Sequence, residues 1–166
     1  DNCLHKLITL RRMLDNREQL ALALNNLGYL YYEEGKYNEA REVYLEGLDI
    51  IRLLESGRSR YFLLASLADL ERDCGYYEKA REYYQEALLL VGANEPYMRC
   101  ETLTHLATVY RWQGRAEAAM TCVQDAMTIA RSHQLLAAYQ EAHIESMHIK
   151  LQPYNIRTVA HEGQKY

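Results

Sequence analysis

The sequence predicts an all-α fold in which pairs of antiparallel helices stack into a solenoid. Three observations lead to this prediction. Pro and Gly number only 2 and 8 among 166 residues, which favours long helices over a strand-rich fold with many turns. Apolar residues recur with the spacing of an amphipathic helix. A motif that contains one glycine also repeats, at Gly35, Gly75 and Gly114, with a period of 40 and then 39 residues.

Each copy of the repeated motif reads as a helix, a tight turn and a second helix. Apolar residues at i, i+3, i+4 and i+7 precede each glycine, and the same period resumes within two residues after it. A helix often ends with a residue in the left-handed conformation, which glycine adopts at little cost. The glycines therefore mark the turn inside each helix pair.

Small residues occupy the positions where the two helices of a pair are expected to cross. A larger side chain there would overpack the crossing, at a cost of about 1–3 kcal/mol. These small residues are Gly28, Ala68 and Ala107 in the first helices and Ala40, Ala80 and Ala119 in the second helices. Tyr44 and Tyr84 fill the space between helices, whereas the third repeat has Val123 at this position and is expected to pack more lightly.

The predicted elements follow in order along the chain. Residues 1–16 hold one helix, at 3–14, of a truncated preceding repeat. Three repeats are predicted at 17–56, 57–94 and 95–133. Their helix pairs are predicted at 18–34 and 37–54, at 60–74 and 77–91, and at 97–112 and 116–132. Residues 134–152 read as a half repeat or terminal cap, with a helix at 135–151 that lacks the glycine turn, and residues 153–166 as a tail.

Two prolines set predicted boundaries. Pro96 suits the first turn of a helix, and Asn94 just before it is the predicted N-cap. Pro153 is predicted to end the last helix, since proline lacks the N–H that a helix interior needs.

Charge and composition exclude several classes of function. The net charge is −4 and the sequence pI is about 5.9, so the cationic excess that neutralises nucleic-acid phosphates is missing. No apolar run approaches the roughly 20 residues that span a membrane. We therefore predict no direct nucleic-acid binding and no membrane insertion.

Cysteine usage predicts a reduced, cytoplasmic setting. The 4 cysteines are scattered and form no C-x-x-C pair, so they read as small core residues. The chain begins at Asp1 without Met, and we read it as a piece of a longer protein.

Catalytic signatures are absent from the sequence. It holds no glycine-rich phosphate loop, no G-x-S-x-G motif and no H-E-x-x-H zinc helix. His143 and His148 are five residues apart, about 140° around a helix, and so cannot share a metal as an i, i+4 pair does. We predict no catalytic residue, no metal site and no cofactor.

The repeated pattern L-G/A-x2-Y-x3-G-x-Y-x2-A-x3-Y-x2-A/G resembles the tetratricopeptide repeat over about residues 21–130. The usual repeat has 34 residues, and the longer units here resemble those of kinesin light chains, bacterial peptide-sensing regulators and the sensor domains of MalT-like regulators. The resemblance implies a right-handed superhelix whose concave groove is lined by the first helix of each pair.

The resemblance also implies which residues face that groove. They are Asn25, Asn26, Tyr29, Tyr32, Asp69, Arg72, His105, Thr108 and Arg111. In related repeats an Asn at the position of Asn26 grips the backbone of a bound peptide, since an amide both donates and accepts. The alternative is that Asn26 bonds a neighbouring helix of its own chain.

Three further groove positions leave two readings each. Arg72 and Arg111 occupy equivalent positions, and would pair either with acidic groups of a partner or with Asp69, Asp73 or Glu101 of this chain. Trp112 is an exposed anchor or packs under the next helix, and the second is favoured. The Lys/Asn pattern of the carboxylate clamp is missing, which disfavours binding of chaperone tails.

The leading prediction is a non-catalytic scaffold that binds a protein or peptide in its groove. One alternative is the effector-sensing module of a MalT-like transcription regulator, and a weaker one is a phosphatase built on such repeats. A solenoid without polar caps exposes apolar surface, so self-association through the ends of the array is also predicted.

Overall fold

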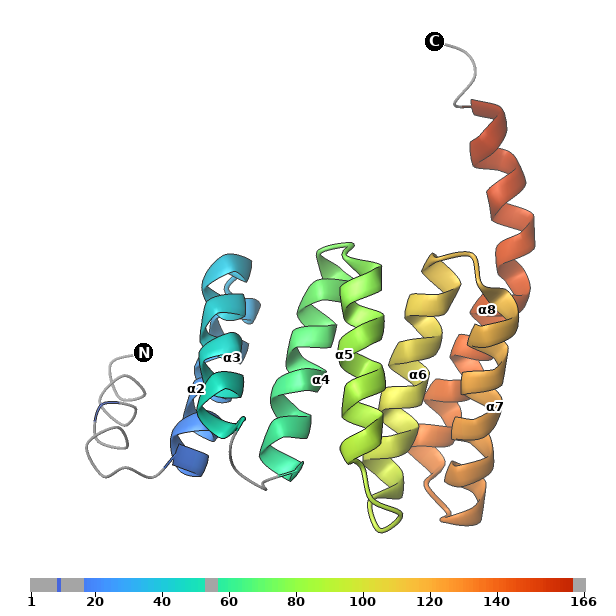
Figure 1. Ribbon diagram of the computed structural model, residues 1–166. Helices are drawn as coiled ribbons and strands as arrows, with labels where there is room; N and C mark the ends of the chain where they lie inside the picture. Colours follow the sequence, from blue (N-terminus) through green and yellow to red (C-terminus); the bar gives the residue numbers. More distant parts are fainter. Residues whose placement is uncertain (1–8, 10–16, 53–56, 163–166) are drawn as a thin grey trace. The chain divides into compact units, whose positions relative to one another are not determined.

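The computed structural model of the chain describes residues 9, 17–52 and 57–162, with side chains described as far as Leu151. Seven helices and no strand make up the regular structure of these residues (Figure 1). The helices are α2 (Arg17–Glu33), α3 (Tyr37–Ile51), α4 (Gly57–Asp73), α5 (Tyr77–Leu90), α6 (Pro96–Trp112), α7 (Ala116–Ser132) and α8 (Leu136–Glu162). The helix predicted at 3–14 lies outside the described residues except for Thr9.

The chain divides into two compact modules. The N-terminal module, Asp1–Gly92, holds α2 to α5, and the C-terminal module, Ala93–Tyr166, holds α6 to α8. Within the N-terminal module α2 packs on α3, α4 packs on α5, and α4 also contacts α2 and α3. Within the C-terminal module α6 packs on α7, and α8 contacts both. The predicted all-α arrangement of helix pairs is confirmed in each module.

The turn inside each helix pair has the conformation that its glycine predicts. Gly35, Gly75 and Gly114 have φ angles of 74°, 80° and 73°. In the first turn the N–H of Lys36 donates to the carbonyl of Tyr31 at 2.8 Å, which closes the helix end as in a Schellman motif. A Cβ on these glycines would meet no atom within 4 Å, so the backbone conformation, and not lack of space, requires glycine there.

The crossing of α2 and α3 requires glycine for the opposite reason. A Cβ on Gly28 would lie 2.4 Å from the Tyr44 ring, which is itself only 1% exposed. A Cβ on Gly47 would lie 2.8 Å from Leu63 in α4. The predicted need for small residues is therefore confirmed at Gly28, where the neighbouring ring takes up the volume that a methyl group would need.

Helix boundaries agree best with prediction next to the glycine turns. α3, α5 and α7 begin at the predicted residues. Pro96 lies in the first turn of α6 as predicted, but the N-cap is Glu95 and not Asn94, and its side chain makes no capping hydrogen bond. The prediction of Asn94 as the N-cap was wrong. Pro96 takes the first position of the helix, so the residue directly before it, Glu95, is the N-cap.

The prediction that Pro153 ends the last helix was wrong. α8 continues through this residue to Glu162. Proline removes one backbone hydrogen bond, crowds the preceding turn and disfavours the helical conformation of the residue before it, at a cost of about 3 kcal/mol, but it does not forbid a helix.

Candidate functional site

The predicted groove residues lie on the first helices of the pairs, α2 and α4 in the N-terminal module and α6 in the C-terminal module. Asn26 and Tyr29 are exposed, with Tyr29 at 54%. The other predicted residues are half-buried, and they are Asn25, Tyr32, Asp69, Arg72, His105, Thr108 and Arg111. Each of the two modules carries its own face.

Arg72 is held between carboxylates of its own helix. Its Nη1 donates to Asp69 at 2.7 Å and its Nε donates to Asp73 at 2.8 Å. The hydroxyl of Tyr84 donates to Asp69 at 2.6 Å, and the hydroxyl of Tyr32 donates to Asp73. Of the two interpretations of Arg72, pairing with a partner or pairing with carboxylates of this chain, the structure shows the second.

This network joins three helices of the N-terminal module. Tyr32 comes from α2, Asp73 from α4 and Tyr84 from α5. Burial raises the pKa of Tyr84 well above its usual value, with the negative charge of Asp69 acting in the same direction. The network therefore fixes the acidic side chains of α4 while leaving about a third of Asp69 and of Asp73 exposed.

Three tyrosines lie close together at the end of α2 and the start of α3. The ring centroids of Tyr29 and Tyr32 are 6.3 Å apart, and those of Tyr32 and Tyr37 are 5.9 Å apart. The charge of Glu33, and its hydrogen bond with the phenol, raise the pKa of Tyr29. The exposed rings are thus bordered by carboxylates.

The two asparagines of α2 differ in their surroundings. Asn26 is exposed, as a residue that contacts a partner must be. The Oδ1 atom of Asn25 is buried and has no hydrogen-bond partner among the described residues. An unsatisfied buried oxygen of this kind costs about 1–3 kcal/mol.

The corresponding face of the C-terminal module is organised around Arg111. Its Nε donates to Glu145 of α8 at 2.7 Å, and the side chain of Glu145 is only 8% exposed. Glu145 also contacts Nδ1 of His148 at 3.3 Å. Arg111 thus has an acidic partner within the chain, Glu145 of α8, a residue that the prediction did not name.

Two further residues of α6 complete this face. Trp112 is 54% exposed and lies under the guanidinium of Arg111, 4.7 Å from the ring centroid, so the favoured reading that it is packed away was wrong. A cation on its face stabilises the ring where α8 does not cover it. The hydroxyl of Thr108 donates to the carbonyl of Thr104 at 3.2 Å and is used within its own helix.

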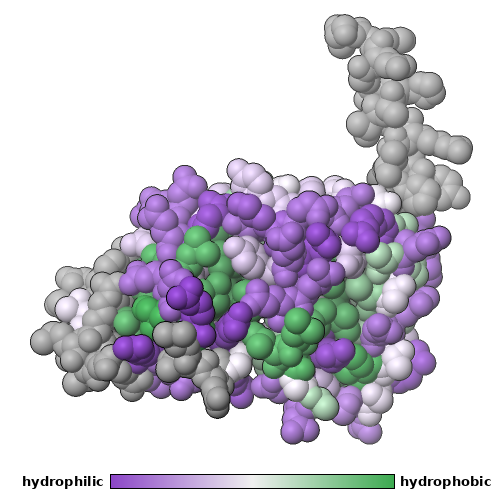
Figure 2. Space-filling view, viewed as in Figure 1, coloured by the Kyte–Doolittle hydropathy of each residue, from purple (hydrophilic) through white to green (hydrophobic). Residues whose placement is uncertain are grey.

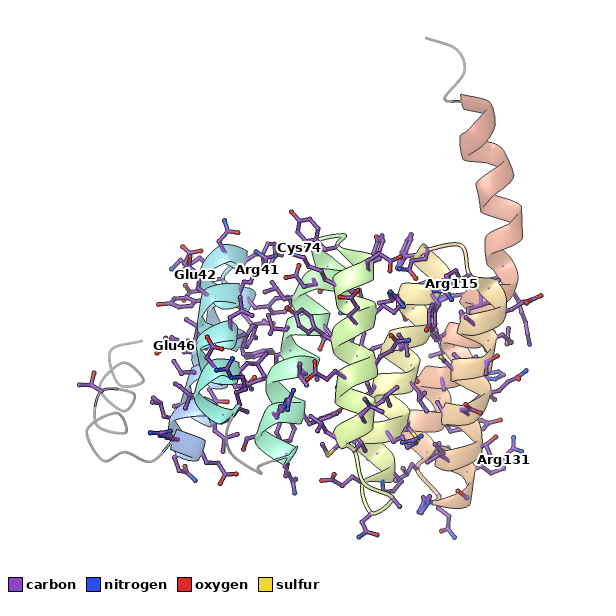
Figure 3. All side chains as sticks on the ribbon, viewed as in Figure 1. Arg41, Glu42, Glu46, Cys74, Arg115 and Arg131 are labelled. Atoms are coloured by element: carbon purple, nitrogen blue, oxygen red, sulfur yellow. The ribbon has the colours of Figure 1, made fainter. Side chains whose placement is uncertain are left out.

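The structure also shows two hollows that the sequence did not predict. One, of about 540 Å³, lies at the turn end of the N-terminal module, where Arg41 and Cys74 come near each other (Figure 3). The other, of about 370 Å³, lies beside the turn between α7 and α8 and is mostly apolar. The first forms between two consecutive glycine turns and the second at a single turn, and the shape of each depends on packing that no local pattern records.

The face in view in Figure 2 is mainly hydrophilic, with hydrophobic side chains gathered in a few patches. Within the described ranges no group of three or more His, Cys, Asp or Glu is arranged to hold a metal ion. None of the described helices is long and apolar enough to cross a membrane.

Family models described as tetratricopeptide repeat match residues 20–56, 63–90 and 99–133, together more than half of the chain. The chain belongs to the tetratricopeptide repeat family. The predicted resemblance to the tetratricopeptide repeat is thereby confirmed. The matched segments coincide with the helix pairs α2–α3, α4–α5 and α6–α7. Comparison with curated proteins finds no match.

Solved structures with the same fold include relatives of kinesin light chain. BtubC (BKLC) from P. vanneervenii is 16% identical to this chain, with a TM-score of 0.67. The alignment covers 85% of this chain and 66% of the BtubC chain. A Podosopora anserina protein described as a kinesin light chain with nearly identical TPR-like repeats is 18% identical, with a TM-score of 0.65, covering 98% of this chain and 86% of its own. At these identities the likeness shows the fold, an all-α helical-repeat solenoid.

The tetratricopeptide repeats of this chain therefore make it a repeat protein of the kind that serves as an interaction scaffold. The chain spans 66% of the length of the BtubC structure.

Proposed function

We propose that this tetratricopeptide repeat protein is a non-catalytic scaffold that binds a protein or peptide segment on the face of its first helices. The observation that supports this most is the exposure of Tyr29 and Asn26 on α2, next to leucines that the same helix buries. Leu24 and Leu27 of the same helix are 1% and 4% exposed. A large exposed aromatic ring beside an exposed amide is the composition of a recognition site.

Asn26 has the chemistry to hold a peptide backbone. Its amide both donates and accepts, and can therefore bond one N–H and one C=O of an extended segment. Asparagine is also a mediocre helix former, so its presence in the interior of α2 suggests a role beyond helix stability. In the C-terminal module the corresponding face presents His105, Thr108 and Arg111, which we include in the proposed binding surface of that module.

A random peptide-display library, panned against the full chain, tests the proposal. We expect enriched peptides whose affinity falls about tenfold or more when Asn26→Ala is introduced, as for a residue central to an interface. Alanine is the better helix former, so the loss would not come from unfolding of α2.

The matched control is Asn38→Ala. Asn38 is an exposed asparagine of the same module that lies on α3, the second helix of the pair, and accepts a hydrogen bond from Arg41. Peptide affinity should be unchanged in this variant. Enrichment that is equal on the wild-type chain and on Asn26→Ala would reject the proposal.

A further inference from the structure

The aromatic rings of this protein are commonly covered by its own cations. Seven such contacts are present among the described residues, with cation-to-centroid distances between 4.7 and 5.8 Å. The covered rings belong to Tyr31, Phe62, Tyr76, Tyr110, Trp112 and Tyr139. Within the described part of the chain no lysine or arginine lies over the ring of Tyr29, although this ring is among the most exposed.

Tyr29 and Tyr76 make the contrast plain. Their exposed fractions are 54% and 55%. The ring of Tyr76 has Lys79 at 5.5 Å and Arg41 at 5.7 Å. The ring of Tyr29 has instead the carboxylate of Glu33, which bonds its hydroxyl. A phenol that donates to a carboxylate keeps its ring electron-rich, and an electron-rich ring face attracts a cation more strongly.

The charges on the same face of the N-terminal module are unbalanced. Glu33, Asp69 and Asp73 contribute three carboxylates, and Arg72, a cation bonded to this group, already lies between two of them. An acidic segment would meet these carboxylates, and Arg72 already donates to Asp69, Asp73 and Tyr84. A cationic side chain would meet complementary charge, which is how interfaces select their partners.

We propose that Tyr29 receives an arginine or lysine side chain of the bound segment, with the cation on the ring face and its N–H groups directed to Glu33. The occupant of this face is accordingly a basic peptide segment. Arginine fits better than lysine, because its planar guanidinium can stack on the ring. Two of its N–H groups can at the same time donate to the carboxylate. This inference rests on the proposed function, since it names the chemistry of the partner at the same face.

The test uses peptides enriched from the random display library, synthesised with a fluorescent label and titrated against the full chain. We expect the enriched peptides to carry Arg or Lys at one recurrent position. Tyr29→Leu should weaken them about two- to fivefold, the size of a cation–π contact at an exposed site. Tyr29→Phe, which keeps the ring, should retain most of that affinity, and Glu33→Gln should weaken binding mainly at low salt.

Two controls separate this contact from general attraction. Tyr76→Leu removes an equally exposed tyrosine whose face is already covered, and it should leave affinity unchanged. Replacing the peptide's cation by Gln should remove the difference between wild type and Tyr29→Leu. If that difference persists with the Gln peptide, the ring acts as an apolar contact and the inference is wrong.

The outcomes distinguish the two proposals. Enriched peptides that are acidic or uncharged, yet weakened by Asn26→Ala, overturn the cation site and leave the binding scaffold standing. Basic peptides unaffected by Tyr29→Leu also overturn the cation site alone. No enrichment over Asn26→Ala overturns both.

Discussion

The two modules build the same helix pair with different side chains at its centre. In the N-terminal module Tyr44 and Tyr84 are 1% and 0% exposed between the paired helices. In the C-terminal module Val123 stands at that position and is equally buried. Gly28 faces Tyr44, whereas the corresponding residue of the third repeat is Ala107. The second repeat has Ala68 together with the buried Tyr84, so the residues at the crossing vary in size from repeat to repeat while each pair stays buried.

The modules also differ in how they hold a buried carboxylate. In the N-terminal module Glu71, 1% exposed, receives both Nε and Nη2 of Arg41 from α3, at 2.7 and 3.2 Å. In the C-terminal module Glu145 receives Nε of Arg111 and also contacts His148. Each module therefore stabilises a buried carboxylate with an arginine from a neighbouring helix. Glu71 is held by the guanidinium of Arg41, whereas Glu145 also contacts a histidine.

The largest expected difference between the modules appears above pH 10, where buried tyrosines titrate in the N-terminal module. By contrast, the raised pKa values of Cys100 and Cys122, about 11 for Cys122, act on the C-terminal module from a lower pH. Burial raises the pKa of Tyr44 to about 12 and that of Tyr84 well above 10. Since the unfolded chain releases these protons near pH 10, stability is fully present below pH 10 and falls as the pH rises beyond it. Each such tyrosine should remove about 1.4 kcal/mol per pH unit in that range. Circular dichroism during an alkaline titration measures the loss of helix.

Tyr44→Phe is the control for this alkaline effect. It keeps the buried ring and removes the titrating hydroxyl, so the loss of helix above pH 10 should become less steep. An identical titration curve for Tyr44→Phe would show that this tyrosine is not what limits alkaline stability. Fluorescence of Trp112, the only tryptophan, reports the C-terminal module in the same experiment.

The buried carboxylates predict the next largest difference. Arg41→Ala leaves Glu71 buried without its guanidinium and should lower the free energy of unfolding by about 3–5 kcal/mol. Arg111→Ala should cost less, since Glu145 keeps its contact with His148. Denaturant unfolding of both variants measures the two costs.

Arg81 is the matched control, because it stands one repeat after Arg41 but pairs with Glu78, which is 70% exposed. Arg81→Ala should change stability by about 1 kcal/mol or less. Equal losses in Arg41→Ala and Arg81→Ala would contradict the role assigned to burial.

The helix crossing predicts a smaller difference. Gly28→Ala places a methyl group against the ring of Tyr44 and should cost about 1–3 kcal/mol. The opposite change in the other module, Ala107→Gly, should cost about 1–2 kcal/mol, through backbone entropy and the loss of a buried methyl group. Adding Tyr44→Val to Gly28→Ala recreates the combination of the third repeat, so the double variant should lose less stability than the sum of the two single variants. Strict additivity in thermal or denaturant unfolding would argue against the shared volume.

The sequence could predict those features that a local pattern records. Gly35, Gly75 and Gly114 predicted their turns because glycine takes the left-handed conformation at little cost. Gly28 predicted the helix crossing because a small residue recurs at its position in each repeat. The pair of Arg41 and Glu71 could not be predicted, since it joins residues 30 apart whose meeting depends on how α3 packs on α4.

The candidate site was predictable in position but less so in chemistry. The resemblance to tetratricopeptide repeats implied that Asn26 and Tyr29 face a groove, and both side chains are exposed on α2. Whether Arg72 can bind a partner depends on its hydrogen bonds to Asp69, Asp73 and Tyr84. These bonds follow from the packing of the helices and could not be predicted from the sequence. The exposure of Trp112 likewise depended on how far α8 covers α6.

The smallest predicted effect concerns the turn between α7 and α8, which has the form of a glycine turn without glycine. Gln134 has a φ of 57°, and Leu135 donates to the carbonyl of Ala130 at 2.8 Å, as the residue after each turn glycine does one pair earlier. A residue other than glycine pays about 1 kcal/mol for this conformation, so Gln134→Gly should raise the melting temperature of the C-terminal module slightly. Gly114→Ala, at a φ of 73° in open space in the same module, should lower it by a similar amount, because only the backbone term differs. If Gln134→Gly is instead destabilising, the side chain of Gln134 must contribute more, through the apolar hollow that it lines with Leu136, than its strained backbone costs.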